Sequence, residues 1–159
     1  MTNSGWIERT AAAAAILSMP CADASAQSRV QTVKECGRSA GYAYYFSGGR
    51  VPADKSGMKQ DGVDGGRIIL NVTDSDLDIL LKDATGTTQS VKAGGGKIIL
   101  RGSNNNLLAL MVVYDEATTE NYVFQLDRQG DGTVVWTTVR TAGQVNKMSL
   151  MTSECRGPR

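Results

Sequence analysis

The sequence contains no histidine among its 159 residues. Catalytic arrangements that need an imidazole, such as Ser-His-Asp and Cys-His, are therefore excluded. The same absence removes zinc sites with imidazole ligands and proton relays that use a side chain titrating near neutral pH. Most familiar hydrolase mechanisms are closed to this chain, and we expect neither a cofactor nor a bound metal.

The chain also lacks an excess of charge and a long apolar run. Its 17 Lys and Arg and 16 Asp and Glu leave a net charge of +1, without the basic surplus of a phosphate-binding surface. Nucleic acid is therefore not an expected partner. A transmembrane helix needs about 20 apolar residues in a row, which the sequence does not contain. We expect a single monomeric domain.

The first 26 residues have the composition of a secretory signal peptide. A polar start that contains Arg9 is followed by the apolar run 11–19 and then by the small residues 24–26 at the cleavage position. We expect cleavage before Gln27, a mature β domain over 27–159, and a periplasmic or secreted bacterial protein. The alternative is an Ala-rich N-terminal helix that stays attached.

Cys21 lies within this leader and invites comparison with lipidated cysteines. Lipidation sites have Leu three residues earlier and a small residue directly before the cysteine, whereas this chain has Ser18 and Pro20 there. The pattern thus disfavours a lipid anchor.

Removal of residues 1–26 leaves two cysteines, Cys36 and Cys155. An even number of cysteines in an exported protein predicts a disulfide. A reactive thiol is disfavoured because no histidine and no CxxC spacing lower a cysteine pKa here.

Apolar residues alternate with polar ones over most of the mature chain, which is typical of strands with one buried face. The expected strands number eight or nine and cover residues 42–46, 67–73, 77–82, 88–92, 97–101, 107–114, 120–127, 133–139 and 145–152. Their short, turn-rich connections predict an all-β antiparallel meander. A sheet of that size closes into a barrel or folds into a sandwich. A disulfide between the two ends of the meander favours the barrel.

Two segments depart from this pattern. Residues 107–114 are apolar on both faces, and a short N-terminal helix over 28–39, with Val30 and Val33 inward, is the expected cover. Residues 47–66 have no sustained periodicity and are expected to form a long loop, which in a compact domain is usually functional or mobile.

The candidate binding residues lie in and beside this loop: Tyr45, Lys55, Lys59, Asp61 and Asp64. Alternation sends Tyr42, Tyr44 and Phe46 to one face, expected to be core, and leaves Tyr45 exposed or half-covered as a contact residue. Asp61 and Asp64 are interpreted as turn residues or as an acid–base pair. No residue is assigned a catalytic role.

The aspartates at 74, 76 and 78 resemble the start of a calcium loop. An EF-hand needs glycine and glutamate where this chain has Ile79 and Thr85, so a solvated turn is the preferred interpretation.

The expected architecture, a small exported barrel with linked ends, is similar to that of the periplasmic lysozyme inhibitors. Their SGxxY-type loop is not matched, because residues 47–51 place Val51 at the tyrosine position. The resemblance therefore implies an architecture and assigns no residue a role.

Two function classes follow from these features. The favoured one is a non-enzymatic exported envelope or periplasmic module that binds an unidentified protein or small-molecule ligand through residues 47–66. The alternative is a hydrolase or lyase that uses carboxylates or tyrosine near the same segment.

Overall fold

The structure is a computed structural model and describes residues 31–73, 76–115, 117–125 and 131–157. The expected signal peptide, residues 1–26, lies outside these ranges and remains a prediction. Within the described ranges, no helix is long and apolar enough to cross a membrane.

Ten β-strands and the short 3-10 helix η1, Ala53–Lys55, make up the described secondary structure. The strands are β1 Gln31–Tyr45, β2 Gly57–Val63, β3 Arg67–Val72, β4 Leu77–Lys82, β5 Thr88–Ser90, β6 Lys97–Ser103, β7 Leu107–Tyr114, β8 Thr118–Gln125, β9 Gly132–Arg140 and β10 Lys147–Arg156.

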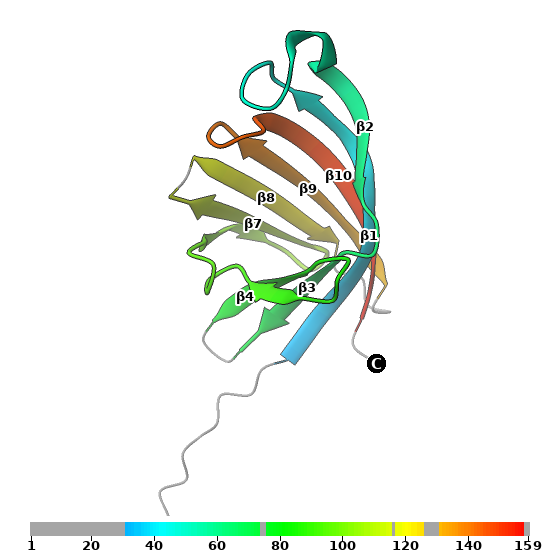
Figure 1. Ribbon diagram of the computed structural model, residues 1–159. Coiled ribbons are helices and arrows are strands. Elements are labelled where there is room, and N and C mark those ends of the chain that lie inside the picture. Colours follow the sequence, from blue (N-terminus) through cyan, green and yellow to red (C-terminus); the bar gives the residue numbers. More distant parts are fainter. Residues whose placement is uncertain (1–30, 74–75, 116, 126–130, 158–159) are drawn as a thin grey trace, which may run out of the picture.

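All ten strands belong to one antiparallel sheet, which curls into a half-barrel (Figure 1). Its order is β5-β4-β3-β1-β10-β9-β8-β7-β6, and β2 pairs with β1 beside this path. β5 and β6, at the two ends of the order, are joined directly by residues 91–96. The all-β antiparallel prediction is confirmed, and a single curled sheet agrees with the preference for a barrel over a sandwich.

The core lies on the concave face and follows the predicted alternation. Ile68, Leu70 and Ile79 are buried on β3 and β4, and Tyr122 and Phe124 are buried on β8. Because residues paired across neighbouring strands share a face, these side chains meet inside the curl.

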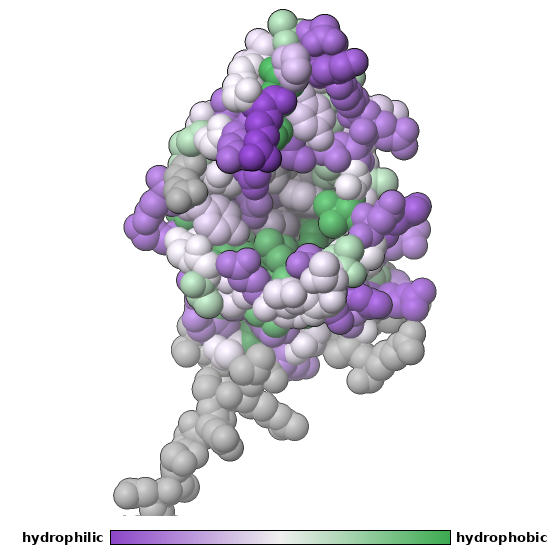
Figure 2. Space-filling model, in the orientation of Figure 1, coloured by the Kyte–Doolittle hydropathy of each residue, from purple (hydrophilic) through white to green (hydrophobic). Residues whose placement is uncertain are grey.

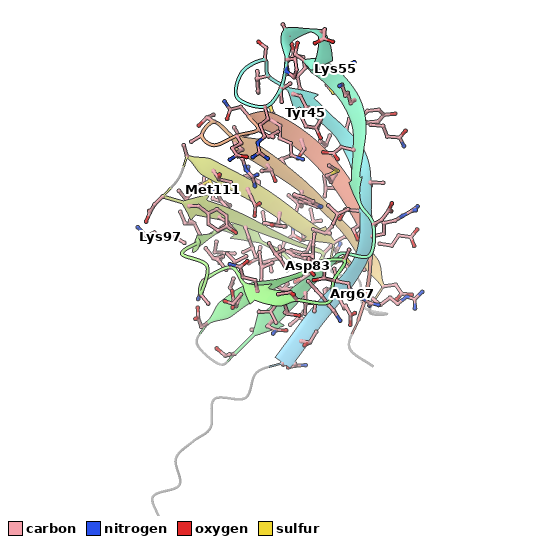
Figure 3. The ribbon with its side chains drawn as sticks, viewed as in Figure 1. Tyr45, Lys55, Arg67, Asp83, Lys97 and Met111 are labelled. Carbon is pink, nitrogen blue, oxygen red and sulfur yellow. A yellow bond between two sulfur atoms is a disulfide. The ribbon has the colours of Figure 1, made fainter. Side chains whose placement is uncertain are left out.

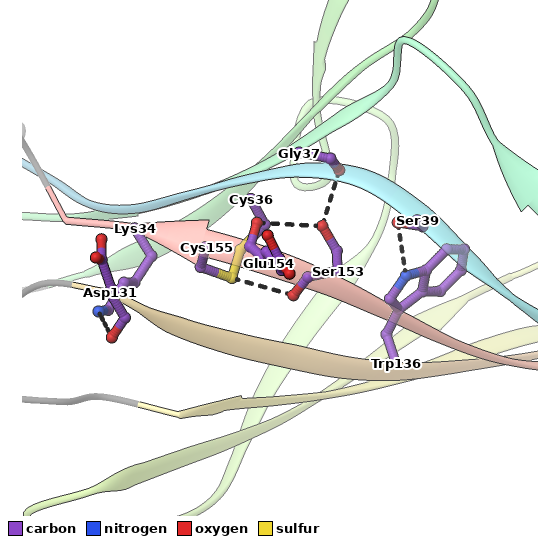
Figure 4. Close-up of a disulfide and its surroundings, with 9 residues drawn as sticks. All are labelled: Lys34, Cys36, Gly37, Ser39, Asp131, Trp136, Ser153, Glu154 and Cys155. Carbon is purple, nitrogen blue, oxygen red and sulfur yellow. Dashed lines mark hydrogen bonds between the residues drawn. A yellow bond between two sulfur atoms is a disulfide. The ribbon is translucent and has the colours of Figure 1, made fainter.

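Cys36 and Cys155 form the predicted disulfide near one end of the half-barrel (Figure 4). They are direct partners on β1 and β10, with Cα atoms 3.8 Å apart, and they are 119 residues apart in the sequence. Nearby, the Trp136 Nε1–H donates a hydrogen bond to Ser39 Oγ at 3.2 Å. The indole of Trp136 is partly buried, stacked 6.0 Å from Tyr122.

The expected N-terminal helix is wrong where the structure describes it, because residues 31–39 belong to the long strand β1. Val33 does pack against the core, but from a strand that pairs with β3 and β10. Long-range pairing overrides the short helical spacing of Val30 and Val33. No described helix covers β7, and the outward Leu107 is exposed.

The expected loop over 47–66 is also wrong, because it contains η1 and strand β2. The first half of β1 pairs with β3, and its second half, from Ser39 to Tyr45, pairs with β2. β2 is exposed along most of its length, so it has no apolar face to produce a period-two signal.

The aromatic run at the end of β1 faces the opposite way from the prediction. Tyr42, Tyr44 and Phe46 are 61%, 42% and 45% exposed, whereas Ala43 is fully buried. The inward face has little room because the β10 backbone is close: a Cβ on Gly41 would stand 2.1 Å from the carbonyl oxygen of Leu150. Available space, rather than hydrophobicity, decides which face turns inward.

Candidate functional site

Three strands bring a tyrosine, a carboxylate and an amine together on the concave face. Tyr45 ends β1, Asp61 lies on β2, and Lys147 begins β10. The Tyr45 hydroxyl donates a hydrogen bond to Asp61 Oδ2 at 2.9 Å, and Lys147 Nζ donates to the same oxygen at 2.7 Å. Figure 3 shows Tyr45 in the upper part of the half-barrel, beside the ends of the strands. The network therefore links segments that are 86 residues apart.

Lys59 joins this group through the Tyr45 ring. It is the direct partner of the buried Ala43 and so shares the inward face. Its Nζ lies 6.0 Å from the ring centroid, and that of Lys147 lies 5.5 Å away. Two ammonium groups at these distances are attracted to the ring quadrupole. The ring is thus held by its hydroxyl and by its faces.

The network sets the charge of its members. Burial tends to raise the pKa of Asp61, but hydrogen bonds from Lys147, Tyr45 and the backbone N–H of Gly62 outweigh it and hold that pKa below its usual value. The pKa of Tyr45 is raised by burial and by the hydrogen bond to Asp61. At neutral pH, Asp61 is an anion and Tyr45 a neutral donor.

Arg140 extends the group on β9. It is the direct partner of Lys147, so both side chains point to the concave face. We call Tyr45, Lys59, Asp61, Arg140 and Lys147 the mouth. In the view of Figure 2, hydrophilic residues lie around the rim of this side of the molecule and hydrophobic ones toward its middle.

A buried polar row continues inward from the mouth across three strands. It consists of Glu120 on β8, Thr138 on β9 and Ser149 on β10, which are paired in that order and are 8%, 4% and 2% exposed. These positions lie on the face that elsewhere carries the core. The inward face of the sheet is therefore polar next to the mouth.

Within this row, Glu120 accepts the most hydrogen bonds. Its Oε2 accepts hydrogen bonds from the Tyr122 hydroxyl at 2.6 Å and from the Tyr114 hydroxyl at 3.5 Å, and its Oε1 accepts one from Thr138 Oγ1 at 3.5 Å. Burial raises the pKa of Glu120, against the opposing effects of these donors and of Arg140. Burial and Glu120 in turn raise the pKa of Tyr114 to about 12.

Ser149 has no such partner. Its Oγ is one of two buried side-chain oxygens in the described part of the chain that make no hydrogen bond, the other being Asn146 Oδ1. Since most buried polar atoms are hydrogen-bonded, an orphaned hydroxyl beside a cationic mouth suggests that something else contacts it.

The structure brings three of the five predicted binding residues into the mouth, namely Tyr45, Lys59 and Asp61. The other two lie elsewhere: Lys55 forms an exposed ion pair with Asp54 on η1, and Asp64 forms one with Arg38 at 3.5 Å. Asp61 and Asp64 are thus separately paired.

Sequence reasoning missed Lys147, Arg140, Glu120 and Ser149. Arg140 and Lys147 flank the loop that joins β9 to β10, where charged residues are ordinary. Glu120 could have been found from the sequence, because it alternates with Tyr122 and Phe124 on one face of the strand. An acidic residue on that face is buried with them. Only the register reveals that these residues share one face.

A broad depression of about 1270 Å³ lies instead around the N-terminal half of β1 and the end of β10. Its charged residues include Arg67 and Glu35, which pair with each other, and Arg38, which pairs with Asp64. Glu154 and Arg156 complete its charged lining. In the described ranges, no three His, Cys, Asp or Glu residues are grouped to hold a metal.

Comparison with known proteins finds no matching family model, no matching curated protein and no matching solved structure. The chemistry of the site thus rests on its own geometry. Cations, hydroxyls and two carboxylates of different pKa on one concave face are suited to hold a polar ligand by several hydrogen bonds.

Proposed function

We propose that the protein is an exported, non-enzymatic binding module of the bacterial envelope or periplasm, which takes a small polar ligand at the mouth. The observation that carries the proposal is the network in which Tyr45 and Lys147 both bind Asp61. It joins β1, β2 and β10 and holds polar side chains in place before a ligand arrives. Such preorganisation lowers the entropic cost of binding.

Export is supported by two separate features. The Cys36–Cys155 disulfide is a bond that persists in oxidising compartments and is rare in the bacterial cytosol. The leader composition of residues 1–26 is that of a secretory signal. The intact mass of protein recovered from the periplasm tests this part of the proposal, and a chain that starts at Gln27 is the expected result.

Binding is tested by the ligand that the protein retains. Full-length protein is expressed in a bacterium, and the exported form is purified, incubated with periplasmic extract and washed by ultrafiltration. Small molecules released by denaturation are identified by mass spectrometry. We expect at least one compound to be enriched on the wild type and lost from Asp61→Asn, because that change removes the anion that holds Lys147 and Tyr45.

Asp64→Asn is the matched control. It makes the same change of charge three residues away, in an exposed pair with Arg38, and should retain the compound. A compound that is retained equally by both variants would not be bound by the mouth, and the proposal would then fail.

One observation favours a second function, a carboxylate-dependent hydrolase. Asp61 and Glu120 lie on the same concave face, and their pKa values are displaced in opposite directions. Enzymes use such pairs as base and acid. Hydrolysis of chromogenic glycosides and esters by the wild type, with its loss in Glu120→Gln, would support this function.

A further inference from the structure

Arg140 and Lys147 lie directly opposite each other on the concave face. Their Cβ atoms are therefore about 5 Å apart, a separation at which like charges in a sheet are destabilising. Asp61 compensates Lys147 at 2.7 Å. No carboxylate in the described part of the chain forms an ion pair with Arg140, which influences Glu120 only through its field. One positive charge at this point is thus left without a close counterion.

Two hydroxyls lie next to these cations. Thr138 precedes Arg140 by two residues on β9, and Ser149 follows Lys147 by two on β10, so all four side chains point inward. Thr138 and Ser149 are themselves direct partners. Because Ser149 Oγ is buried without a hydrogen bond, this block of two cations and two hydroxyls includes an unused polar group beside an uncompensated charge.

The charges around the block favour a monoanion. Asp61 already pairs with Lys147, so Arg140 is the cation of the block that is left to pair with a ligand. One negative charge on the ligand balances it. A bare carboxylate can accept a hydrogen bond from Ser149 but has none to donate, whereas a ligand that also carries hydroxyls can donate to Glu120 Oε1, which accepts only the hydrogen bond from Thr138 in the described part of the chain.

We propose that Arg140, Lys147, Thr138 and Ser149 bind the carboxylate and adjacent hydroxyls of a small hydroxy acid of the sugar-acid class. Arg140 pairs with the ligand carboxylate, the Ser149 hydroxyl bonds to a ligand hydroxyl, and Glu120 accepts from another. The inference rests on the proposed function and specifies the ligand of the same site.

The test compares three probes by calorimetric titration of the exported protein at pH 7 and low salt. They are D-glucuronate, its methyl ester and cyclohexanecarboxylate. The ester keeps the hydroxyls without the charge, and the last probe keeps the charge without the hydroxyls. We expect glucuronate to bind at least about tenfold more tightly than either, since hydrogen bonds to charged groups are among the stronger ones.

Two variants test which residue recognises the ligand carboxylate and which recognises its hydroxyls. Arg140→Gln should abolish the preference for the acid over its ester, and Ser149→Ala should reduce the preference for glucuronate over cyclohexanecarboxylate. Arg101→Gln, which removes an exposed cation on β6, is the control and should behave as the wild type. Ser149→Ala removes an unpartnered hydroxyl, so it should fold normally and remain informative.

Three results would overturn the inference. If the wild type bound the acid and the ester equally, the mouth could still be a polar site, but recognition of a ligand carboxylate would be excluded. Binding of none of the three probes would exclude the sugar-acid class, while the retained-ligand experiment with Asp61→Asn would decide the proposed function separately. A crystal structure at saturating glucuronate with only a water on Ser149 would assign that hydroxyl to solvent.

Discussion

At the scale of the residue, Glu120 shows how neighbouring groups and burial compete for one carboxyl. Two tyrosine hydroxyls and one threonine hydroxyl hydrogen-bond to it, and each favours its charged form. Burial acts in the other direction and prevails, so that the pKa of Glu120 is raised. A charge at this position is consequently costly to the fold at neutral pH.

Glu120→Gln should therefore change how stability depends on pH. With its pKa raised in the folded state, Glu120 contributes stability that is fully present below the ordinary glutamate pKa of about 4.3 and is lost as the pH rises through the raised value. Glutamine stays neutral, so the variant should gain stability relative to the wild type as the pH rises. The slope cannot exceed about 1.4 kcal/mol per pH unit, because a single group titrates.

Urea unfolding of both proteins between pH 4 and pH 8 measures this difference. Glu154→Gln, at an exposed position of β10, is the control and should track the wild type closely. A difference between Glu120→Gln and the wild type that is constant over the whole pH range would contradict the account.

At the scale of the element, β1 organises the sheet because it pairs with three strands. Its first half lies between β3 and β10, and its second half lies between β2 and β10. Because β2 replaces β3 as the partner of β1 in this second half, β2 lies outside the main strand order, and Asp61 on β2 lies at the mouth. The crossing with β10 is tight at Gly41, whose absent side chain lets the two backbones approach.

Gly41→Ala should thus be strongly destabilising. The added Cβ would stand 2.1 Å from the Leu150 carbonyl oxygen, a backbone atom that cannot rotate away. We expect a loss of about 1 to 3 kcal/mol or more in the free energy of unfolding, as for other overpacked sites. Chemical denaturation followed by tryptophan fluorescence measures it.

Gly102→Ala on β6 is the matched control. No heavy atom lies within 4 Å of the position that its Cβ would take, so this substitution should leave stability nearly unchanged. Equal denaturation midpoints for the two variants would mean that β1 and β10 can separate at little cost.

At the scale of the whole molecule, the disulfide links the strand that opens the described sheet to the one that ends it. The two cysteines are neighbours in space and 119 residues apart in sequence. The first and last strands of the described sheet are thereby linked at the end of the half-barrel away from the mouth. Cross-linking over so long a loop restricts the unfolded chain more than the folded one.

Cys155→Ala should lower the free energy of unfolding by about 2 to 5 kcal/mol, the range for native disulfides of small secreted domains. Urea denaturation of the variant, the oxidised wild type and the reduced wild type measures the loss. The variant and the reduced protein should unfold at similar urea concentrations. Coincident curves for all three would show that the bond constrains little.

The sequence by itself determined the class of fold and the inner face of most strands. Alternation is a local property, so Ile68 and Leu70, or Tyr122 and Phe124, indicate the buried face wherever the strand is placed. The pairing of Cys36 with Cys155 could also be predicted, because they are the two cysteines that remain after the expected signal peptide is removed. The absence of histidine likewise removed whole classes of chemistry without any knowledge of the fold.

Only the tertiary structure decided the orientation of the aromatic run, the existence of β2 and the composition of the mouth. Tyr42 and Tyr44 face outward because the β10 backbone occupies the space inside, and β2 exists because half of β1 needs a partner. Arg140 and Lys147 meet through the register of one hairpin, and Asp61 joins them from a strand two places away. Register and curvature are set by distant segments, and therefore no local pattern carries them.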